Sequence, residues 1–173
     1  LAASIILVGI PVYWLLKVYY DPEVVIKLND TFAWLAYLTE KLLLPKKVKD
    51  EIVFQMGDIR GKTVLEYGCS IGTLTMELAR KVSPSGKVYA TNISSKELAI
   101  SQRRARRRGH EHIVFIHDAH QANRIHPEVP VVNVLISFGM LSYMQDVKKV
   151  LADIHGVLED NGKLLMVDWV NFF

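Results

Sequence analysis

Cysteine is nearly absent from this sequence, since Cys69 is the only one in 173 residues. One thiol cannot form an internal disulfide, and it excludes a cysteine-rich metal site. The 6 histidines show no spacing typical of metal ligands, so no metal is expected. Cys69 lies inside a glycine-containing turn, where a small side chain that fills a tight loop is a simpler interpretation than a reactive thiol.

Charge of one sign is also scarce, because the formal net charge is only +3 at pH 7. Such a small excess does not by itself indicate a nucleic-acid-binding protein, and no nucleic-acid partner is expected. The most basic run, residues 103–108, lacks the interleaved aromatic residues on which single-stranded nucleic acids stack. A solvated helix face is its simpler interpretation, and contact with anionic lipid or nucleic acid is the alternative.

Apolar residues are plentiful: 50% of the chain is hydrophobic, enough for one domain with a substantial core. Residues 1–16 carry no charge, and Tyr13, Trp14 and Lys17 gather near the end of this run as side chains do at a membrane interface. The run is slightly shorter than the roughly 20 apolar residues of a spanning helix. Because the chain begins with Leu1 rather than Met, we expect upstream residues that could complete it. A membrane anchor or interfacial helix is favoured, and a buried helix that caps the domain is the alternative.

A second apolar segment, residues 32–44, is expected to form a helix that Asn29, Asp30 or Thr31 caps and that Pro45 ends. It is apolar almost all round, so it needs cover from protein or lipid on more than one side. Lysines at positions 46, 47 and 49 suit an anionic membrane surface, or equally an ordinary solvated helix start. We therefore divide the chain into a membrane-associating segment, residues 1–45, and a second domain, residues 46–173.

The second domain begins with a strand, a glycine turn and a helix. Residues 63–65 read as a buried strand, the chain turns through Gly68 and Gly72, and Leu74 and Leu78 recur at helical spacing. This unit lets a ligand approach bare backbone at the positive end of a helix, and Glu66 adds an acceptor there.

Strands and helices alternate regularly beyond this unit, which predicts an α/β fold with a buried, mostly parallel, doubly wound sheet. Ligands bind such sheets beyond the carboxyl ends of the strands, so the polar residues that follow each strand predict a site. The expected strands are residues 63–65, 87–93, 113–116, 131–137 and 163–167, and the expected helices are residues 48–56, 73–82, 94–108 and 146–158.

From about Val48 to its end the chain resembles the class I S-adenosylmethionine-dependent methyltransferases, whose fold is Rossmann-like. Residues 66–72, Glu-Tyr-Gly-Cys-Ser-Ile-Gly, match the family's first motif with Ser70 in place of its middle glycine. The resemblance implies that S-adenosylmethionine is the cofactor. It also implies that Gly68 and Gly72 approach the methionine part of the cofactor and that Glu66 supports its ammonium group.

Later positions extend the resemblance. Asn92 stands where the family usually ends its second strand in an acidic residue that accepts the ribose hydroxyls, and an amide can still accept one hydrogen bond. Asp118 and Ala119 resemble the pair at the adenine edge, and Asn133 stands where the family commonly has aspartate. The resemblance therefore predicts the following cofactor-binding residues: Glu66, Tyr67, Gly68, Cys69, Gly72, Asn92, Ile93, Asp118, Ala119 and Ser137.

The family's sheet normally finishes with a helix and a reversed hairpin of two further strands, whereas this chain stops at Phe173, directly after the fifth strand. We therefore expect a methyltransferase domain that lacks the last strands, because the chain is incomplete at its C-terminus.

Catalytic residues are much less evident than the cofactor site. Methyl transfer from a sulfonium depends mainly on placing the nucleophile in line in a dry pocket, and a base is needed only when the acceptor must lose a proton. The loop at residues 138–143 lies where the family receives its acceptor, and it would offer an apolar wall. His120 and Tyr143 are the candidates for a catalytic role.

Together these features predict a membrane-associated methyltransferase that acts on a lipophilic acceptor, either a quinone precursor or a phospholipid headgroup. The lysines that follow the apolar segments place its catalytic domain on the cytoplasmic side. The alternatives are a soluble small-molecule methyltransferase and a non-catalytic membrane scaffold that keeps the fold. A nicotinamide-dependent oxidoreductase is less favoured, because its fingerprint requires a third glycine at the start of the helix.

Overall fold

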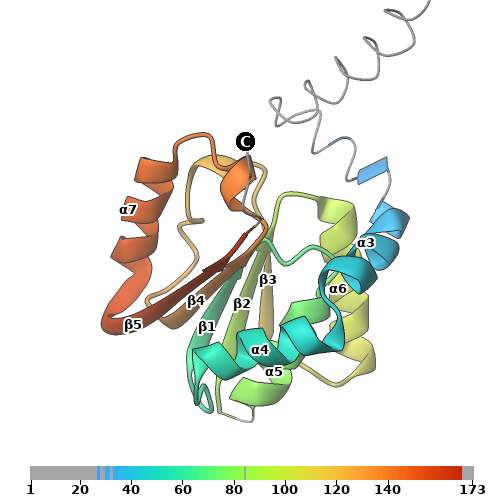
Figure 1. The fold of residues 1–173 in the computed structure, drawn as a ribbon, viewed down its shortest axis with the longest axis horizontal. Coiled ribbons are helices and arrows are strands. Elements are labelled where there is room, and N and C mark those ends of the chain that lie inside the picture. The colour runs from blue at the N-terminus through green and yellow to red at the C-terminus, as the bar shows by residue number, and fades with distance from the viewer. Residues whose placement is uncertain (1–26, 28–29, 32, 84, 169–173) are drawn as a thin grey trace, which may run out of the picture.

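The computed structural model describes residues 27, 30–31, 33–83 and 85–168 of the chain, and it contains a five-stranded sheet with helices on both faces (Figure 1). The strands are β1 Thr63–Tyr67, β2 Lys87–Asn92, β3 Ile113–His117, β4 Val132–Phe138 and β5 Leu158–Val167. The α-helices are α3 Ala36–Leu43, α4 Lys46–Met56, α5 Thr73–Val82, α6 Ser95–Arg107 and α7 Val147–Val157. Three short 3₁₀ helices are η1 Ala33–Leu35, η2 Gln121–Asn123 and η3 Leu141–Tyr143.

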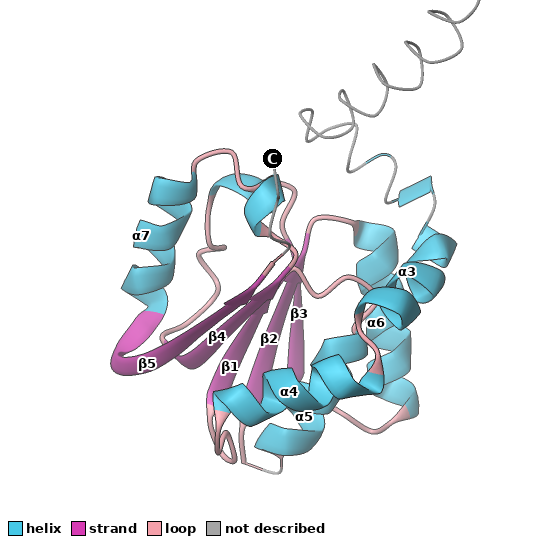
Figure 2. Ribbon diagram, in the orientation of Figure 1, coloured by secondary structure: helices cyan, strands magenta, loops and turns pink. Residues whose placement is uncertain are grey.

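Helices α4, α5 and α6 cover one face of the sheet, and α7 covers the other (Figure 2). Successive side chains of a strand point to opposite faces, so β1 contributes Val64 to the first layer and Leu65 to the second. Val134 and Leu135 of β4 do the same. Burial on both faces explains why these strands read as continuous apolar runs rather than as alternating ones.

All strand pairs are parallel, in the order β3-β2-β1-β4-β5. β1 is central: Leu65 pairs with Tyr89 of β2 on one side and with Leu135 of β4 on the other. The chain runs from β1 outward to β3 and then returns across the sheet to β4. The strand order therefore reverses between β1 and β4, and their carboxyl ends flank the point where ligands bind in open α/β sheets.

Two helix starts predicted from the sequence are confirmed. Thr73 opens α5 directly after the glycine turn. Ser94 caps α6, and its hydroxyl accepts a hydrogen bond from the Glu97 backbone N–H at 3.2 Å.

Two other segments differ from the prediction. Residues 33–43 form the 3₁₀ turn η1 followed by an α3 of eight residues, rather than one longer helix. Asp30, one of the three proposed caps, instead accepts a hydrogen bond from the Ser94 hydroxyl. The fifth strand, expected at residues 163–167, begins earlier, at Leu158, and its pairing with β4 shifts register between Val132 and Val134. Asn133, at this shift, donates to Glu159 and accepts from the Thr63 N–H.

The apolar run at residues 1–16 lies outside the described residues. Within the part of the chain that the structure describes, no helix has the length and apolar character needed to cross a membrane. The domain boundary proposed after residue 45 falls at Pro45, between α3 and α4, and it stays a prediction.

Truncating the middle of β4 should destabilise the fold strongly, because Leu135 is completely buried. We expect Leu135→Ala to lower the free energy of unfolding by about 2–5 kcal/mol. Leu151→Ala on the half-exposed side of α7 is the matched control and should cost far less. Urea unfolding followed by circular dichroism measures both. Equal losses would contradict the assigned core.

Candidate functional site

The glycine turn between β1 and α5 is held in a left-handed conformation at three positions. The φ angles are +90° at Gly68, +45° at Ser70 and +82° at Gly72. The N–H groups of Gly68 and Cys69 both donate to the carbonyl oxygen of Thr91 at 3.1 and 2.8 Å, which fastens the turn to β2. Ser70 therefore keeps the turn geometry that a glycine would adopt.

The absence of side chains at Gly68 and Gly72 allows close packing. A Cβ atom at Gly72 would lie within 3 Å of the Ser101 side chain of α6, and one at Gly68 would meet the side chain of Met140. Gly68 therefore lies beside the loop after β4, while Gly72 lets α5 begin against α6.

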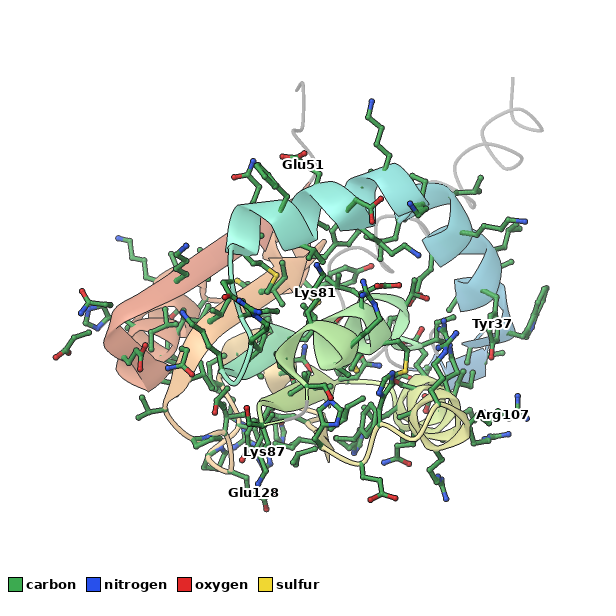
Figure 3. The ribbon with its side chains drawn as sticks, turned by 90° about the horizontal axis from the view of Figure 1, so that it is seen from below. Tyr37, Glu51, Lys81, Lys87, Arg107 and Glu128 are labelled. Atoms are coloured by element: carbon green, nitrogen blue, oxygen red, sulfur yellow. The ribbon has the colours of Figure 1, made fainter. Side chains whose placement is uncertain are left out.

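Arg104 and Glu40 also bind this turn. The Arg104 guanidinium donates to the Ile71 carbonyl at 2.7 Å and to the Thr73 hydroxyl at 3.0 Å, and it lies 5.9 Å from the centre of the Tyr37 ring. Figure 3 shows Tyr37 projecting from α3 at the edge of the molecule. From α3, Glu40 Oε1 accepts the Ile71 N–H at 3.1 Å. The turn is thus held by α3 and α6 as well as by the sheet.

Sequence reasoning missed both residues. Arg104 was grouped with a solvated basic run, although its neighbours Arg103 and Arg106 are exposed and Arg104 is half-buried. Glu40 carried a usable signal: it is the only acidic residue in the otherwise apolar stretch 32–44. A lone carboxylate among apolar residues is expected to have a buried partner.

Three buried carboxylates surround the turn, from α3, β1 and α6. Burial raises the pKa of Glu66 to about 8, and the nearby charge of Glu40 acts in the same direction. Burial likewise raises the pKa of Glu40 and of Glu97. Among the residues that the structure describes, Oε2 of Glu66 and Oε2 of Glu40 are buried and have no hydrogen-bond partner. This arrangement favours a cationic ligand at the turn.

Asn92, at the end of β2, connects the turn to α6. Its Oδ1 accepts the Ser70 N–H at 3.2 Å, and its Nδ2 donates to Glu97 Oε2 at 2.9 Å. Asn92 is therefore engaged with its neighbours, and it brings the Glu97 carboxylate to the place where the sequence lacks an acidic residue. Ribose binding at this position stays a prediction.

Asp118, after β3, is buried and holds its own loop together. Its Oδ1 accepts the His120 N–H at 2.9 Å, and the Arg124 guanidinium binds both carboxylate oxygens at 3.0 and 3.2 Å. A carboxylate oxygen accepts up to two hydrogen bonds, and Oδ2 has this one partner among the bonds described. The expected contact with the adenine amine stays a prediction.

The remaining predicted cofactor residues differ in their burial and in the direction of their side chains. The Tyr67 side chain points away from the turn, into the layer beneath α7, where its hydroxyl donates to the Gln121 carbonyl. Cys69 is buried, and burial raises the pKa of its thiol well above the ordinary value, which fits the packing interpretation. Ser137 is buried at the end of β4, Ile93 is half-buried after β2, and Ala119 is exposed after β3.

The loops after β3, β4 and β5 are joined at the same edge of the sheet. Gln145 donates its N–H to the Ala122 carbonyl at 3.1 Å, and Leu141 donates its N–H to Asp168 Oδ2 at 2.6 Å. His120 and Tyr143 are exposed on two of these joined loops. Within the described ranges, no group of acidic, histidine or cysteine side chains could hold a metal ion.

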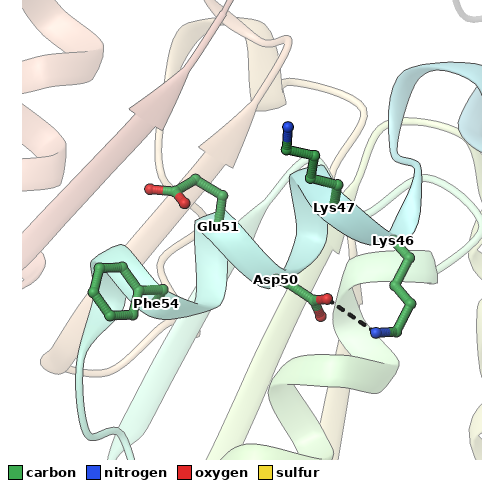
Figure 4. Close-up of a pocket in the computed structure, with 5 residues that line it drawn as sticks. All are labelled: Lys46, Lys47, Asp50, Glu51 and Phe54. Atoms are coloured by element: carbon green, nitrogen blue, oxygen red, sulfur yellow. Dashed lines mark hydrogen bonds and ion pairs between the residues drawn. The ribbon is translucent and has the colours of Figure 1, made fainter.

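An open pocket lies elsewhere, on the outer surface of α4 (Figure 4). It contains none of the predicted cofactor residues, and Lys46 is paired across it with Asp50 at 3.2 Å. We therefore place the candidate site at the glycine turn and not here.

The comparisons with known proteins agree with this geometry. A family model described as a methyltransferase domain matches residues 58–172, so the chain belongs to that methyltransferase family. A demethylmenaquinone methyltransferase from Anoxybacillus flavithermus is 27% identical over 109 residues, which are 63% of this chain and 45% of that protein. One from Geobacillus stearothermophilus is 28% identical over 116 residues, 67% and 49% of the two chains. This chain thus spans about half the length of these curated relatives.

Solved structures show the same fold. A SAM-dependent methyltransferase from Aquifex aeolicus superposes with a TM-score of 0.65 at 21% identity, over 87% of this chain and 73% of that one. Coclaurine N-methyltransferase bound to N-methylheliamine and SAH superposes with a TM-score of 0.63 at 19% identity, over 69% of this chain and 34% of that one. The resemblance to class I methyltransferases is therefore confirmed, together with S-adenosylmethionine as the cofactor it implied.

Stability should fall as the pH rises, because Glu66 is protonated in the folded protein below about pH 8 whereas an unperturbed glutamate ionises near 4.5. Between these values the folded state holds the extra proton, so the free energy of unfolding declines with a slope of up to about 1.4 kcal/mol per pH unit. Glu66→Gln should flatten this decline in urea unfolding measured across the pH range. The exposed Glu51→Gln should keep the wild-type slope, and an unchanged slope in Glu66→Gln would refute the assignment.

A bulky residue at Gly68 should abolish cofactor binding by covering the backbone. Gly68→Val and Gly109→Val both force a β-branched residue into a left-handed position, at a cost of at least about 1–2 kcal/mol. Gly109 has open space around it and lies away from the turn, so only Gly68→Val should lose binding. Isothermal titration with S-adenosylhomocysteine tests this. Retained binding in folded Gly68→Val would contradict the site.

Proposed function

We propose that the protein transfers the methyl group of S-adenosylmethionine to a lipophilic acceptor, either a quinone precursor or a phospholipid headgroup. The observation that carries this proposal is the two-sided character of α3 and the preceding turn η1. One side places Glu40 against the glycine turn. The other exposes Trp34, Leu38 and Leu42 to solvent, the last with 70% of its surface accessible.

Leu38 and Leu42 are four residues apart in α3 and so lie on one face of that helix, and Trp34 stands in the preceding turn η1. We call these three exposed side chains the apolar stripe. Tyr37 and Leu43 extend the exposed apolar surface. An exposed apolar surface of this kind marks a place where protein, ligand or membrane binds. Its position beside the proposed donor site supports an acceptor that is itself apolar.

The described residues fit the proposed cofactor. The backbone of the turn from Gly68 to Gly72 would hold its methionine part, and the unpartnered oxygen of Glu66 would accept from its ammonium group. When bound, the cofactor supplies an electrophilic methyl group on a cationic sulfur. The protein's own contribution is to bind, to orient and to exclude water: Met140 lies over the turn, and the hydrogen-bonded loops at 118–124 and 139–145 close the same edge.

A general base is required only for an acceptor that loses a proton. His120 and Tyr143 are the candidates, since both stand on the joined loops. We assign neither a fixed role, because a phenol or enol acceptor and a carbon acceptor make different demands on the site.

We further propose that the protein acts at the cytoplasmic surface of a membrane, with residues 1–45 as its membrane-associating segment and residues 46–173 as its catalytic domain. The exposed apolar stripe supports this, as do Lys46 and Lys47, which are exposed at the start of α4. The names of the curated relatives point to a menaquinone precursor as one acceptor class. An anchored domain meets lipid substrates at a high effective concentration.

Fractionation of cells that contain the full-length protein, followed by radiolabelled methyl transfer, tests this proposal. We expect the protein in the membrane fraction and label in organic-extractable material. A protein found entirely in the soluble fraction, with label only in water-soluble products, would favour a soluble small-molecule methyltransferase. Cofactor binding without transfer into any extract would favour the non-catalytic scaffold.

Polar substitutions in the stripe should impair use of the acceptor and leave the donor site intact. We expect Leu38→Gln with Leu42→Gln to lower methyl transfer to lipid extracts several-fold, with S-adenosylhomocysteine affinity unchanged. Val131→Gln is the control, because Val131 is an exposed apolar residue just before β4, at the opposite edge of the sheet. Equal methyl-transfer rates in the wild type and in both variants would show that the stripe takes no part in the use of the acceptor.

A further inference from the structure

We propose that Glu40 of α3 is a second cofactor-binding carboxylate, which acts with Glu66 to receive the cationic methionine end of S-adenosylmethionine. This inference rests on the proposed function, and it adds to the donor site a residue from outside the segment that matches the methyltransferase family model, residues 58–172. The glycine motif itself gives no sign of Glu40, because α3 lies before it in the chain and helix α4 lies between them.

Glu40 is held on the glycine turn by the Ile71 N–H, with the side chains of Ser70 and Thr73 beside it, and one of its carboxylate oxygens has no close hydrogen-bond donor among the described residues. Its Oε1 accepts the Ile71 N–H at 3.1 Å, so the group sits directly on the glycine turn. Its Oε2 is buried and has no hydrogen-bond partner among the described residues, although only 9% of the Glu40 surface is accessible. A buried carboxylate oxygen without a donor costs free energy unless a ligand supplies one.

Glu66, at the end of β1, is a second buried carboxylate at the turn, with the Thr75 side chain as its neighbour. It is 4% accessible, and its Oε2 likewise has no partner in the described part of the chain. The two carboxylates are close enough for the charge of Glu40 to raise the pKa of Glu66. Two carboxylates that converge from α3 and β1 cannot both ionise cheaply without a cation between or beside them.

The other charged groups around the turn do not neutralise the carboxylates of Glu40 and Glu66. Arg104 of α6 lowers the pKa of Glu40, but the contacts described for its guanidinium are with the Ile71 carbonyl, the Thr73 hydroxyl and the Tyr37 ring. Glu97 of α6 is a further acidic group whose pKa burial raises, and the charge of Asp30 acts on it in the same direction. The thiol of Cys69 is neutral because burial raises its pKa. The surroundings are therefore net acidic, and an ammonium or sulfonium group complements them.

Cofactor binding should consequently release protons. Near neutral pH the carboxylate pair holds a proton in the free protein, because the pKa values of both groups are raised and that of Glu66 is about 8. A cation favours the ionised form, so binding lowers these pKa values and expels the proton. Affinity should therefore increase as the pH rises towards 8.

Isothermal titration of the full chain with two ligands tests the assignment. S-adenosylhomocysteine carries the ammonium group, whereas 5′-methylthioadenosine shares the nucleoside but lacks the amino-acid part. We expect Glu40→Gln to weaken S-adenosylhomocysteine binding about ten- to hundredfold, the effect of one charge-assisted hydrogen bond, and to leave methylthioadenosine affinity unchanged. Glu51→Gln, which removes an exposed carboxylate on α4, should match the wild type for both ligands.

Repeating the titrations in buffers of different ionisation enthalpy counts the protons released. We expect fewer protons from Glu40→Gln than from wild type, and intermediate affinity from Glu40→Asp, which keeps the charge but shortens its reach. Equal affinity and proton release in Glu40→Gln and wild type would overturn the proposal. So would an equal loss of both ligands, which would mean that Glu40 only supports the turn. A wild-type protein that binds neither ligand would instead refute the proposed function itself.

Discussion

A carboxylate buried away from water is costly unless a cation or several hydrogen-bond donors replace its solvent. This protein buries three of them, Glu40, Glu66 and Glu97, around one turn of the backbone. Arg104 offsets this charge only in part, because its described hydrogen bonds go to the backbone and to a threonine hydroxyl. The turn is consequently acidic and largely buried, and bound protons or a positively charged ligand stabilise its carboxylates. A sulfonium cofactor that also carries an ammonium group satisfies this requirement.

The fold determines where that charge accumulates. A parallel sheet covered on both faces has no room for polar groups within it, so they collect where the strands end. The strand order reverses between β1 and β4, which opens the carboxyl edge beside Gly68. Thr91, Asn92 and Asp118 then fix the neighbouring loops by hydrogen bonds. Because α3 packs on the same edge and exposes its apolar stripe on the opposite side, one short helix links the donor site to the proposed acceptor surface.

Local signals in the sequence were sufficient to predict much of the fold and the position of the glycine turn. The glycine turn, the capped start of α6 and the five parallel strands follow from spacing, caps and apolar runs that lie within a few residues of each other. The side-chain directions of Tyr67 and Asn92 did not follow, because they depend on which face of the sheet each strand position takes. Glu40 and Arg104 reach the turn from 31 and 33 residues away from Ile71, and no local pattern encodes such a contact. Ser70, which stands in place of the motif's middle glycine, adopts the left-handed conformation that the turn requires.

The central claim is that the acidic glycine turn holds the methionine end of the cofactor. A crystal structure of the protein with S-adenosylhomocysteine tests it most directly. The account predicts ligand density at the carboxyl ends of β1 and β4, with the ligand's amino group within about 2.7–3.2 Å of a Glu66 carboxylate oxygen. Density confined to another surface, such as the α4 pocket, or an amino group directed away from both Glu66 and Glu40, would contradict it.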